Sequence, residues 1–209
     1  MFKFFKKSNP IEKFWSWYEF QADEFKDFQK APDFYLREII KQIRKISPGL
    51  AVELEPPQEG LIKMTISADG DVELFPSVQE IVAQAPDIPG WQFIAFRQRA
   101  PLEKLESLKL KGPEEDLQLK DKRFFPIVEG EHLDVIIYVS GLNPYNQQSL
   151  GYACLLLADN ILGEYDCVHK VRGYDFHAMP EDPEELKELK PLIDLAAYVD
   201  AFHEKDSPS

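Results

Sequence analysis

The chain has few cysteines and no long apolar run, and each of these shortages excludes a class of protein. Its 209 residues include two cysteines, Cys154 and Cys167, too few for the disulfide framework of a small secreted protein. No stretch approaches the roughly 18 apolar residues that a membrane-spanning helix needs. Residues 1–10 contain Phe and Lys but no apolar signal-peptide core, so we expect a cytoplasmic protein. This start is typical of a short strand or a frayed end, with weak contact to a membrane surface as the alternative.

Recognisable catalytic and cofactor motifs are also missing. The sequence has no glycine-rich dinucleotide or P-loop motif, no zinc-protease motif and no nucleophile-elbow motif. Candidate nucleophiles such as Ser140 and Ser149 have no histidine at an informative spacing. We therefore expect no cofactor, and we favour a binding protein over an enzyme.

Positive charge is scarce, and the balance shifts along the chain. The net charge is −13; residues 1–48 carry 10 Lys/Arg against 7 Asp/Glu, whereas residues 180–209 carry 3 against 9. Such an acidic protein repels phosphate backbones, so we expect no nucleic-acid partner. The charge serves solubility, and it also suits a basic protein partner or mimicry of a nucleic acid.

Two helices are predicted before residue 49. Asn9 and Pro10 start the first helix as its N-cap and first residue. Its apolar residues recur at helical spacing and predict a core-facing stripe: Ile11, Phe14, Trp15, Tyr18, Ala22 and Phe25. The second helix begins near Pro32 and ends before Pro48, so residues 1–48 are expected to form a helical hairpin.

The remainder reads as two β-β-α-β units followed by a helix. The first unit has strands at 51–54 and 61–66 with a loose loop between them, a helix at 74–85 and a strand at 91–99. The second has strands at 117–125 and 133–139, a helix at 147–162 and a strand at 164–171. A polar connection, 100–123, is typical of a surface loop or lid, and a last helix is expected at 183–203.

These patterns predict an α+β fold. An N-terminal helical hairpin precedes a mainly antiparallel sheet, with two β-β-α-β units and a C-terminal helix. The expected organisation is a hairpin at 1–48 and an α+β domain at 49–209, together forming one compact unit.

Residues 164–177 carry the densest set of chemically active side chains. If residues 164–171 form a strand, Cys167 and His169 share one face and Glu164 lies on the other. Asp175 and His177 follow and would complete a metal-binding set. Because zinc needs three or four converging ligands, the alternative interpretation is an ordinary strand whose pleat displays these residues.

A second candidate site follows Trp91. Arg97 and Arg99 are expected on the strand face that carries Trp91 and Phe93. They suit a bidentate clamp on a carboxylate or phosphate, with Glu164 as an acid or base, or they pair with nearby Asp and Glu. Both interpretations are open at this point.

Three segments, in order, resemble a known family. Residues 12–19, "EKFWSWYE", residues 67–99, "SADGDVELFPSVQEIVAQAPDIPGWQFIAFRQR", and residues 155–166, "LLLADNILGEYD", resemble a family of uncharacterised bacterial proteins of about this length. The resemblance covers about residues 10–175. It implies an intracellular bacterial protein of a single unit, and it supplies neither an activity nor catalytic residues.

Two functional hypotheses result. The first is a non-enzymatic, acidic binding or regulatory protein with a basic protein partner, in one version immunity- or inhibitor-like. The second is a small metal-dependent or acid/base enzyme that uses residues 164–177. Neither predicts an oligomeric state.

Overall fold

The protein is α+β, and its chain divides into two compact units. A computed structural model describes residues 9–107, 109–111 and 116–204. Contacts group the chain into unit 1, residues 1–97, and unit 2, residues 98–209. The expected boundary at 48/49 is therefore not where the chain divides, because the helical hairpin shares its contacts with the first β-β-α-β segment. No described helix is both long and apolar enough to cross a membrane.

The N-terminal helices of unit 1 form where the sequence predicts them. Helix α1 spans Pro10–Phe25, and the Asn9 side chain accepts a hydrogen bond from the Ile11 amide at 3.0 Å. The six buried residues of α1 are the predicted stripe. A short 3-10 turn, Phe28–Lys30, leads to helix α2, Pro32–Ile43.

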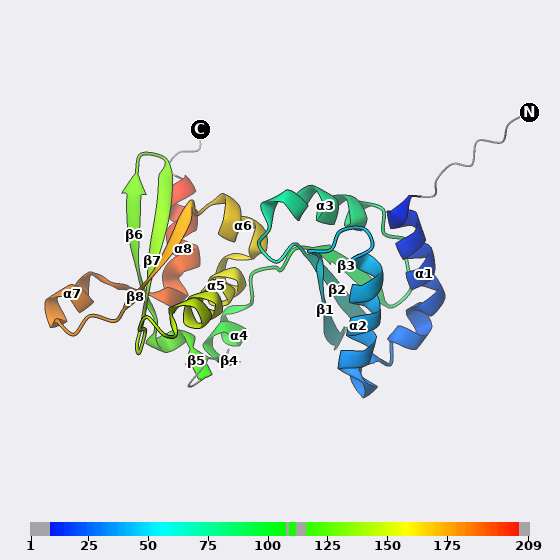
Figure 1. The fold of residues 1–209 in the computed structure, drawn as a ribbon, viewed down its shortest axis with the longest axis horizontal. Helices are drawn as coiled ribbons and strands as arrows, with labels where there is room; N and C mark the ends of the chain where they lie inside the picture. Colours follow the sequence, from blue (N-terminus) through cyan, green and yellow to red (C-terminus); the bar gives the residue numbers. More distant parts are fainter. Residues whose placement is uncertain (1–8, 108, 112–115, 205–209) are drawn as a thin grey trace, which may run out of the picture. The chain divides into compact units, whose positions relative to one another are not determined.

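The first predicted β-β-α-β unit is also present. Strands β1 (Ala51–Gln58), β2 (Leu61–Ser67) and β3 (Trp91–Ala95) form a sheet in that order, with helix α3 (Phe75–Ala83) between β2 and β3 (Figure 1). β2 pairs antiparallel with β1 and parallel with β3. The crossover through α3 brings β3 back in the same direction as β2.

The expected loose loop between the first two strands is a tight turn instead. β1 continues through Pro56 and Pro57 with a bulge between Glu55 and Gln58, and only Glu59 and Gly60 connect the strands. Both turn residues have positive φ, 52° and 83°. Two successive positive φ values suit a two-residue hairpin turn, and a bulge accommodates prolines that cannot donate to a ladder.

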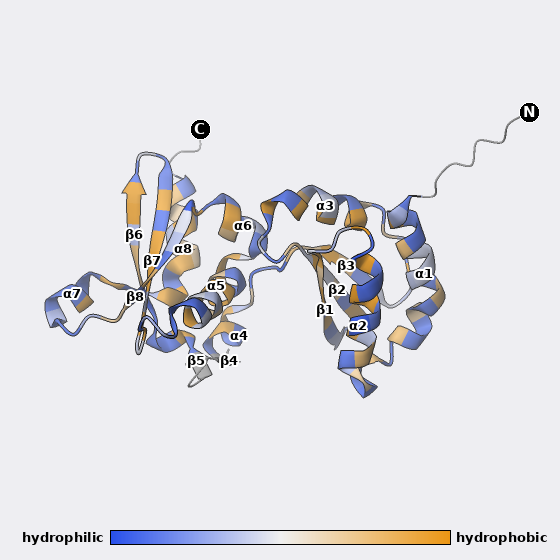
Figure 2. Cartoon of the chain, viewed as in Figure 1, coloured by the Kyte–Doolittle hydropathy of each residue, from blue (hydrophilic) through white to orange (hydrophobic). Residues whose placement is uncertain are grey.

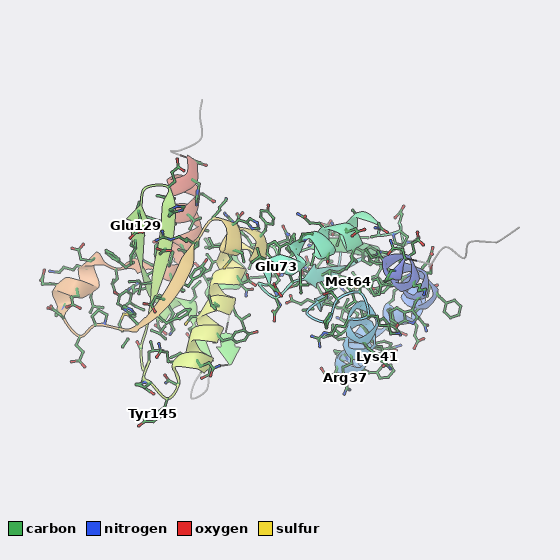
Figure 3. The ribbon with its side chains drawn as sticks, turned by 45° about the horizontal axis from the view of Figure 1, so that its top comes forward. Arg37, Lys41, Met64, Glu73, Glu129 and Tyr145 are labelled. Atoms are coloured by element: carbon green, nitrogen blue, oxygen red, sulfur yellow. The ribbon has the colours of Figure 1, made fainter. Side chains whose placement is uncertain are left out.

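Aromatic rings from α1 and β3 fill the core of unit 1. Tyr18 is fully buried, with the rings of Trp91 and Phe93 at 5.3 and 5.5 Å. The Trp15 indole donates to the Ile81 carbonyl at 2.8 Å, and the Trp91 indole donates to the Ala22 carbonyl at 3.2 Å. Figure 3 shows Met64 of β2 inside this unit. The aromatic stripe is therefore core packing.

Unit 2 opens with short elements before its main sheet. Helix α4 (Leu102–Ser107), strands β4 (Lys109–Lys111) and β5 (Asp116–Gln118), and a 3-10 turn (Leu119–Asp121) occupy part of the connection expected to be an irregular loop. Within this connection, residues 108 and 112–115 lie outside the described part of the chain, as do the N-terminal residues 1–8.

The second β-β-α-β unit forms the main sheet of unit 2. Strands β6 (Arg123–Glu129), β7 (His132–Val139) and β8 (Gly173–Ala178) join the short β9 (Lys190–Pro191) in the order β8-β7-β6-β9. β7 is antiparallel to β6 and parallel to β8. Helix α5 (Gln147–Leu162) forms as predicted, and Gly163 follows it with φ 76°.

Two expected elements of unit 2 are wrong. Residues 164–169 form helix α6, and the next strand, β8, begins at Gly173. The helix expected at 183–203 is divided into α7 (Pro183–Glu188), β9, a 3-10 turn (Leu192–Asp194) and α8 (Leu195–Glu204). Pro191 explains the division, because proline cannot donate a helical hydrogen bond and it favours an extended residue before it.

Tyr18 provides a test of the unit 1 core. Among the described residues its hydroxyl is buried without a hydrogen-bond partner, a situation that costs roughly 1–3 kcal/mol. We expect Tyr18→Phe to raise the free energy of unfolding of unit 1 by about 1 kcal/mol. Trp15→Phe removes an indole that bonds to Ile81, so it is expected to lower that free energy.

The measurement is urea-induced unfolding monitored by tryptophan fluorescence. All three tryptophans, Trp15, Trp17 and Trp91, belong to unit 1, so the signal reports this unit alone. A loss of stability in Tyr18→Phe as large as that in Trp15→Phe would show that the Tyr18 hydroxyl is bonded.

Candidate functional site

The segment with the densest set of active side chains is helical, not extended. Within α6, the Tyr165 and His169 rings stack with centroids 4.1 Å apart, and Asp166 pairs with Lys170 at 3.1 Å. Both pairs are four residues apart, the spacing at which helical side chains meet. Glu164 and Asp166 also place acidic groups in the first turn, where the helix dipole favours them.

The predicted metal ligands do not gather at one point. Cys167 is buried and its Sγ lies 3.1 Å from the Tyr174 hydroxyl, while His169 is exposed and its Nδ1 lies 3.0 Å from the Tyr165 carbonyl. Asp175 and His177 project from alternate positions of β8. Over the described ranges, no three His, Cys, Asp or Glu side chains lie close enough to hold a metal ion.

Glu164 is the most deeply buried of the candidate residues. It is fully buried and lies next to Gly163 at the start of α6. After burial itself, Glu164 also contributes to the raised pKa of the Cys167 thiol. Burial raises the pKa of that thiol to about 12, and it raises the pKa of Cys154 to about 11. These thiols therefore stay protonated at neutral pH, which makes them poor nucleophiles and poor metal ligands.

Arg97 and Arg99 pair with carboxylates, one of the two roles that the sequence left open. β3 ends at Ala95, and Phe96 adopts a positive φ of 64°, so strand alternation stops before the arginines. Arg97 belongs to unit 1, where its guanidinium bonds to Glu53 and, at 2.9 Å, to Asp69. Arg99 belongs to unit 2. The two arginines therefore do not form the shared strand face that was expected.

Arg99 fastens the start of unit 2 to three of its elements. Its guanidinium bonds both oxygens of Asp200 in α8 at 2.6 and 2.8 Å and Asp166 in α6 at 2.7 Å. Its Nε donates to the Leu162 carbonyl at the end of α5. Hydrogen bonding to Arg99 lowers the pKa of Asp200 to about 2. The charge of Arg99 is thus used in holding the fold together.

One face of the unit 2 sheet carries apolar side chains at outward positions. Helices α5, α6 and α8 lie on one side of β6, β7 and β8 in Figure 1, and the residues of β7 that point toward them are all buried: Leu133, Val135, Ile137 and Val139. Strand pairing places the alternate residues together on the other side. We call these residues the open face: Arg123, Phe125, Ile127, Asp134, Ile136, Tyr138, Asp175 and His177.

The centre of the open face is apolar. Phe125 and Ile127 are each 37% exposed, Ile136 lies directly beside Phe125 in the pairing, and Tyr138 continues the same row along β7. Figure 2 shows hydrophobic residues along β6 and β7. A solvated sheet face usually carries polar residues at its outward positions. These apolar positions therefore mark the face as a candidate contact surface.

Charged groups border this apolar centre. Arg172 bonds to Asp134 and, at 2.8 Å, to Glu129, whose position at the far end of β6 is labelled in Figure 3. The bond from Arg172 lowers the pKa of Asp134. On β8, Asp175 holds the Nε2 of His177 at 2.9 Å, and the Phe176 amide together with His177 lowers the pKa of Asp175. Of the predicted set, only this Asp–His pair has the geometry of an oriented acid or base.

A pocket lies where β7 and β8 end. It has a volume of about 600 Å³, and its walls come from both strand ends, the loop before α5 and the segment that leads into α7. Its principal side chains are Tyr138, Phe176, His177, Met179, Gln147 and Glu185. Pockets outside the carboxyl ends of parallel strands are frequent ligand sites. We call it the strand-end pocket.

Comparisons with known proteins do not place the chain in a family. No protein-family model matches it, and no curated protein or solved structure is similar to it. The resemblance to uncharacterised bacterial proteins therefore stays a prediction. The open face and the strand-end pocket are therefore the features that bear on function.

Sequence reasoning missed most of the open face. The strand expected at 117–125 stops before Ile127, which belongs to β6, and neither Tyr138 nor Glu185 was singled out. The signal was available in part, because alternation along β7 puts Asp134, Ile136 and Tyr138 on the side opposite the buried residues. That α5, α6 and α8 all pack against the other side is a tertiary fact.

The reactivity of the two thiols tests whether Cys154 and Cys167 are buried in unit 2. Both cysteines belong to unit 2, both are buried, and the pKa of each thiol is raised above its usual value of 9.0. At pH 8 in the folded protein we expect neither to react with a disulfide reagent, because little thiolate exists and access is closed.

The measurement is the thiol count by absorbance, before and after unfolding in guanidinium chloride. We expect no released chromophore from the folded chain and two equivalents from the unfolded one. Fast release of one equivalent from the folded protein would place a reactive cysteine at its surface, and with it revive the enzyme hypothesis.

Proposed function

We propose that this is a non-enzymatic binding protein whose unit 2 holds a basic segment of a protein partner on its open face. The observation that carries the proposal is the row of apolar side chains, Phe125, Ile127 and Ile136, at outward positions of a sheet face. Covering these side chains contributes binding free energy of about 25 cal/mol per Å² of apolar area removed from water. Polar residues at these positions would have been sufficient for solubility alone.

The charge of unit 2 supports the choice of a basic partner. Residues 98–209 contain 22 Asp/Glu and 12 Lys/Arg, whereas residues 1–97 contain 15 and 12. Most of the negative charge thus belongs to the unit with the apolar face. Opposite charge on a partner steers its approach and disfavours acidic competitors. An immunity- or inhibitor-like protein is the version of this proposal in which the basic partner is an enzyme.

The ion pairs described above favour binding over catalysis. Arg97, Arg99 and Arg172 each hold carboxylates of their own unit, and Cys167 is a buried thiol. These groups stabilise the fold, so they do not form a reacting centre. The open face, by contrast, has side chains whose contacts the described unit leaves incomplete.

The proposal is tested with peptides selected by the full chain from a displayed random library. We expect the selected peptides to combine Lys or Arg with apolar residues. We expect Ile127→Lys to weaken their binding at least about tenfold, a loss of ~1.4 kcal/mol, because the change removes apolar contact and repels a basic ligand. Affinity is measured by fluorescence anisotropy.

The matched control is Leu102→Lys. Leu102 is also an exposed aliphatic residue of unit 2, but it lies in α4, away from the open face. This variant should bind the selected peptides like the unmodified chain. Peptides without a bias toward positive charge, or equal binding by Ile127→Lys and the unmodified protein, would contradict the proposal.

A further inference from the structure

The strand-end pocket has walls that differ in kind. Tyr138 supplies an aromatic ring from the open face, whereas Phe176 lines the pocket from the side of the sheet that faces α5, where its ring lies against Gly151. Met179 adds a polarisable side chain just beyond β8. The Tyr138 ring meets the His177 ring edge to face, with centroids 5.6 Å apart. A pocket of about 600 Å³ with the Tyr138 ring in its wall is suited to a flat or elongated group rather than to a small ion.

The remaining wall is acidic. Glu185 lines the pocket from α7, a helix that Figure 1 shows on the opposite side of the strands from α5 and α8. It belongs to the exposed segment 179–188, which has five Asp/Glu and one Lys. That lysine, Lys187, pairs with Glu184 at 2.6 Å rather than with Glu185. Next to the pocket, Asp175 holds His177. Glu185 is the only Asp, Glu, Lys or Arg among the described residues that line the pocket, so the pocket favours a cation.

We propose that the strand-end pocket receives an arginine side chain of the protein partner. The Tyr138 ring suits a planar guanidinium, which stacks on rings more readily than an ammonium does. Glu185 supplies a carboxylate that the guanidinium can bond with two parallel N–H groups. The pocket continues the open face at Tyr138 and His177, so an arginine next to apolar residues of the partner reaches both. This inference rests on the proposed function, since it names one residue of the basic partner.

The experiment uses three small probes and one reporter. Nα-acetyl-arginine N-methylamide is titrated into the full chain, beside the citrulline analogue, its neutral isostere, and the norleucine analogue, an apolar one. The methyl resonance of Met179 is followed by NMR in protein with carbon-labelled methionine methyl groups. Met64, fully buried in unit 1, is the internal reference.

We expect the arginine probe to move the Met179 methyl signal saturably, with a dissociation constant on the order of 1 mM, typical of about −4 kcal/mol. The citrulline and norleucine probes should bind at least about tenfold more weakly, since neither carries the charge that Glu185 attracts. The Met64 signal should not move.

Two variants test whether Glu185 is the carboxylate that binds the arginine probe. Glu185→Gln should reduce arginine binding to the level of citrulline, whereas Glu188→Gln should leave it unchanged. Glu188 belongs to the same helix but does not line the pocket. An unmoved Met179 signal, equal binding of arginine and citrulline, or an equal loss in both variants would overturn the pocket assignment.

A failure of the pocket assignment can be distinguished from a failure of the proposed function. If the arginine probe fails while selected peptides still bind in an Ile127-dependent manner, only the pocket assignment is wrong. If the probe binds through Glu185 while Ile127→Lys leaves peptide binding intact, the pocket stands and the open face does not.

Discussion

The alternation of β7 is the constraint on which unit 2 depends. Leu133, Val135, Ile137 and Val139 are buried under α5 and α8, and burial of each such side chain contributes roughly 1.5–3 kcal/mol. Because a one-residue shift would turn every side chain to the other face, the register of β7 is strongly fixed. The same pleat fixes Asp134, Ile136 and Tyr138 on the opposite face. The position of the open face is therefore a geometric consequence of the core, and its apolar composition is the part that folding does not require.

Most of the candidate site residues that the sequence indicated form contacts that stabilise the fold. Arg99 joins three helices through Asp166, Asp200 and the Leu162 carbonyl, and Cys167 lies in the core with Tyr174. A buried charged or polar group lowers the stability of the fold unless it has a partner, because burying it unpaired costs free energy. Their pairing accounts for residue types that would otherwise suggest catalysis.

The sequence predicted those elements whose signal is periodic over several turns or strands. The stripe of α1, the bounds of α5 and the first β-β-α-β order follow from apolar spacing, and each is confirmed. Helix α6 was missed because six residues give too little periodicity, although the Tyr165–His169 and Asp166–Lys170 spacings indicated it. The partners of Arg99 lie 63–101 residues along the chain, beyond any local pattern. The open face depends on where helices do not pack, which spacing cannot give.

The central claim, that one face of the unit 2 sheet is open to solvent at Ile127 while the other is covered by helices at Val135, can be tested by thiol labelling. Ile127→Cys and Val135→Cys place a cysteine on the open and the buried face of neighbouring strands, and both natural cysteines are buried. A maleimide should label the Ile127→Cys variant at nearly the rate of a free thiol and the Val135→Cys variant only after unfolding. Protection of position 127 in the folded protein, to the same degree as position 135, would contradict the account.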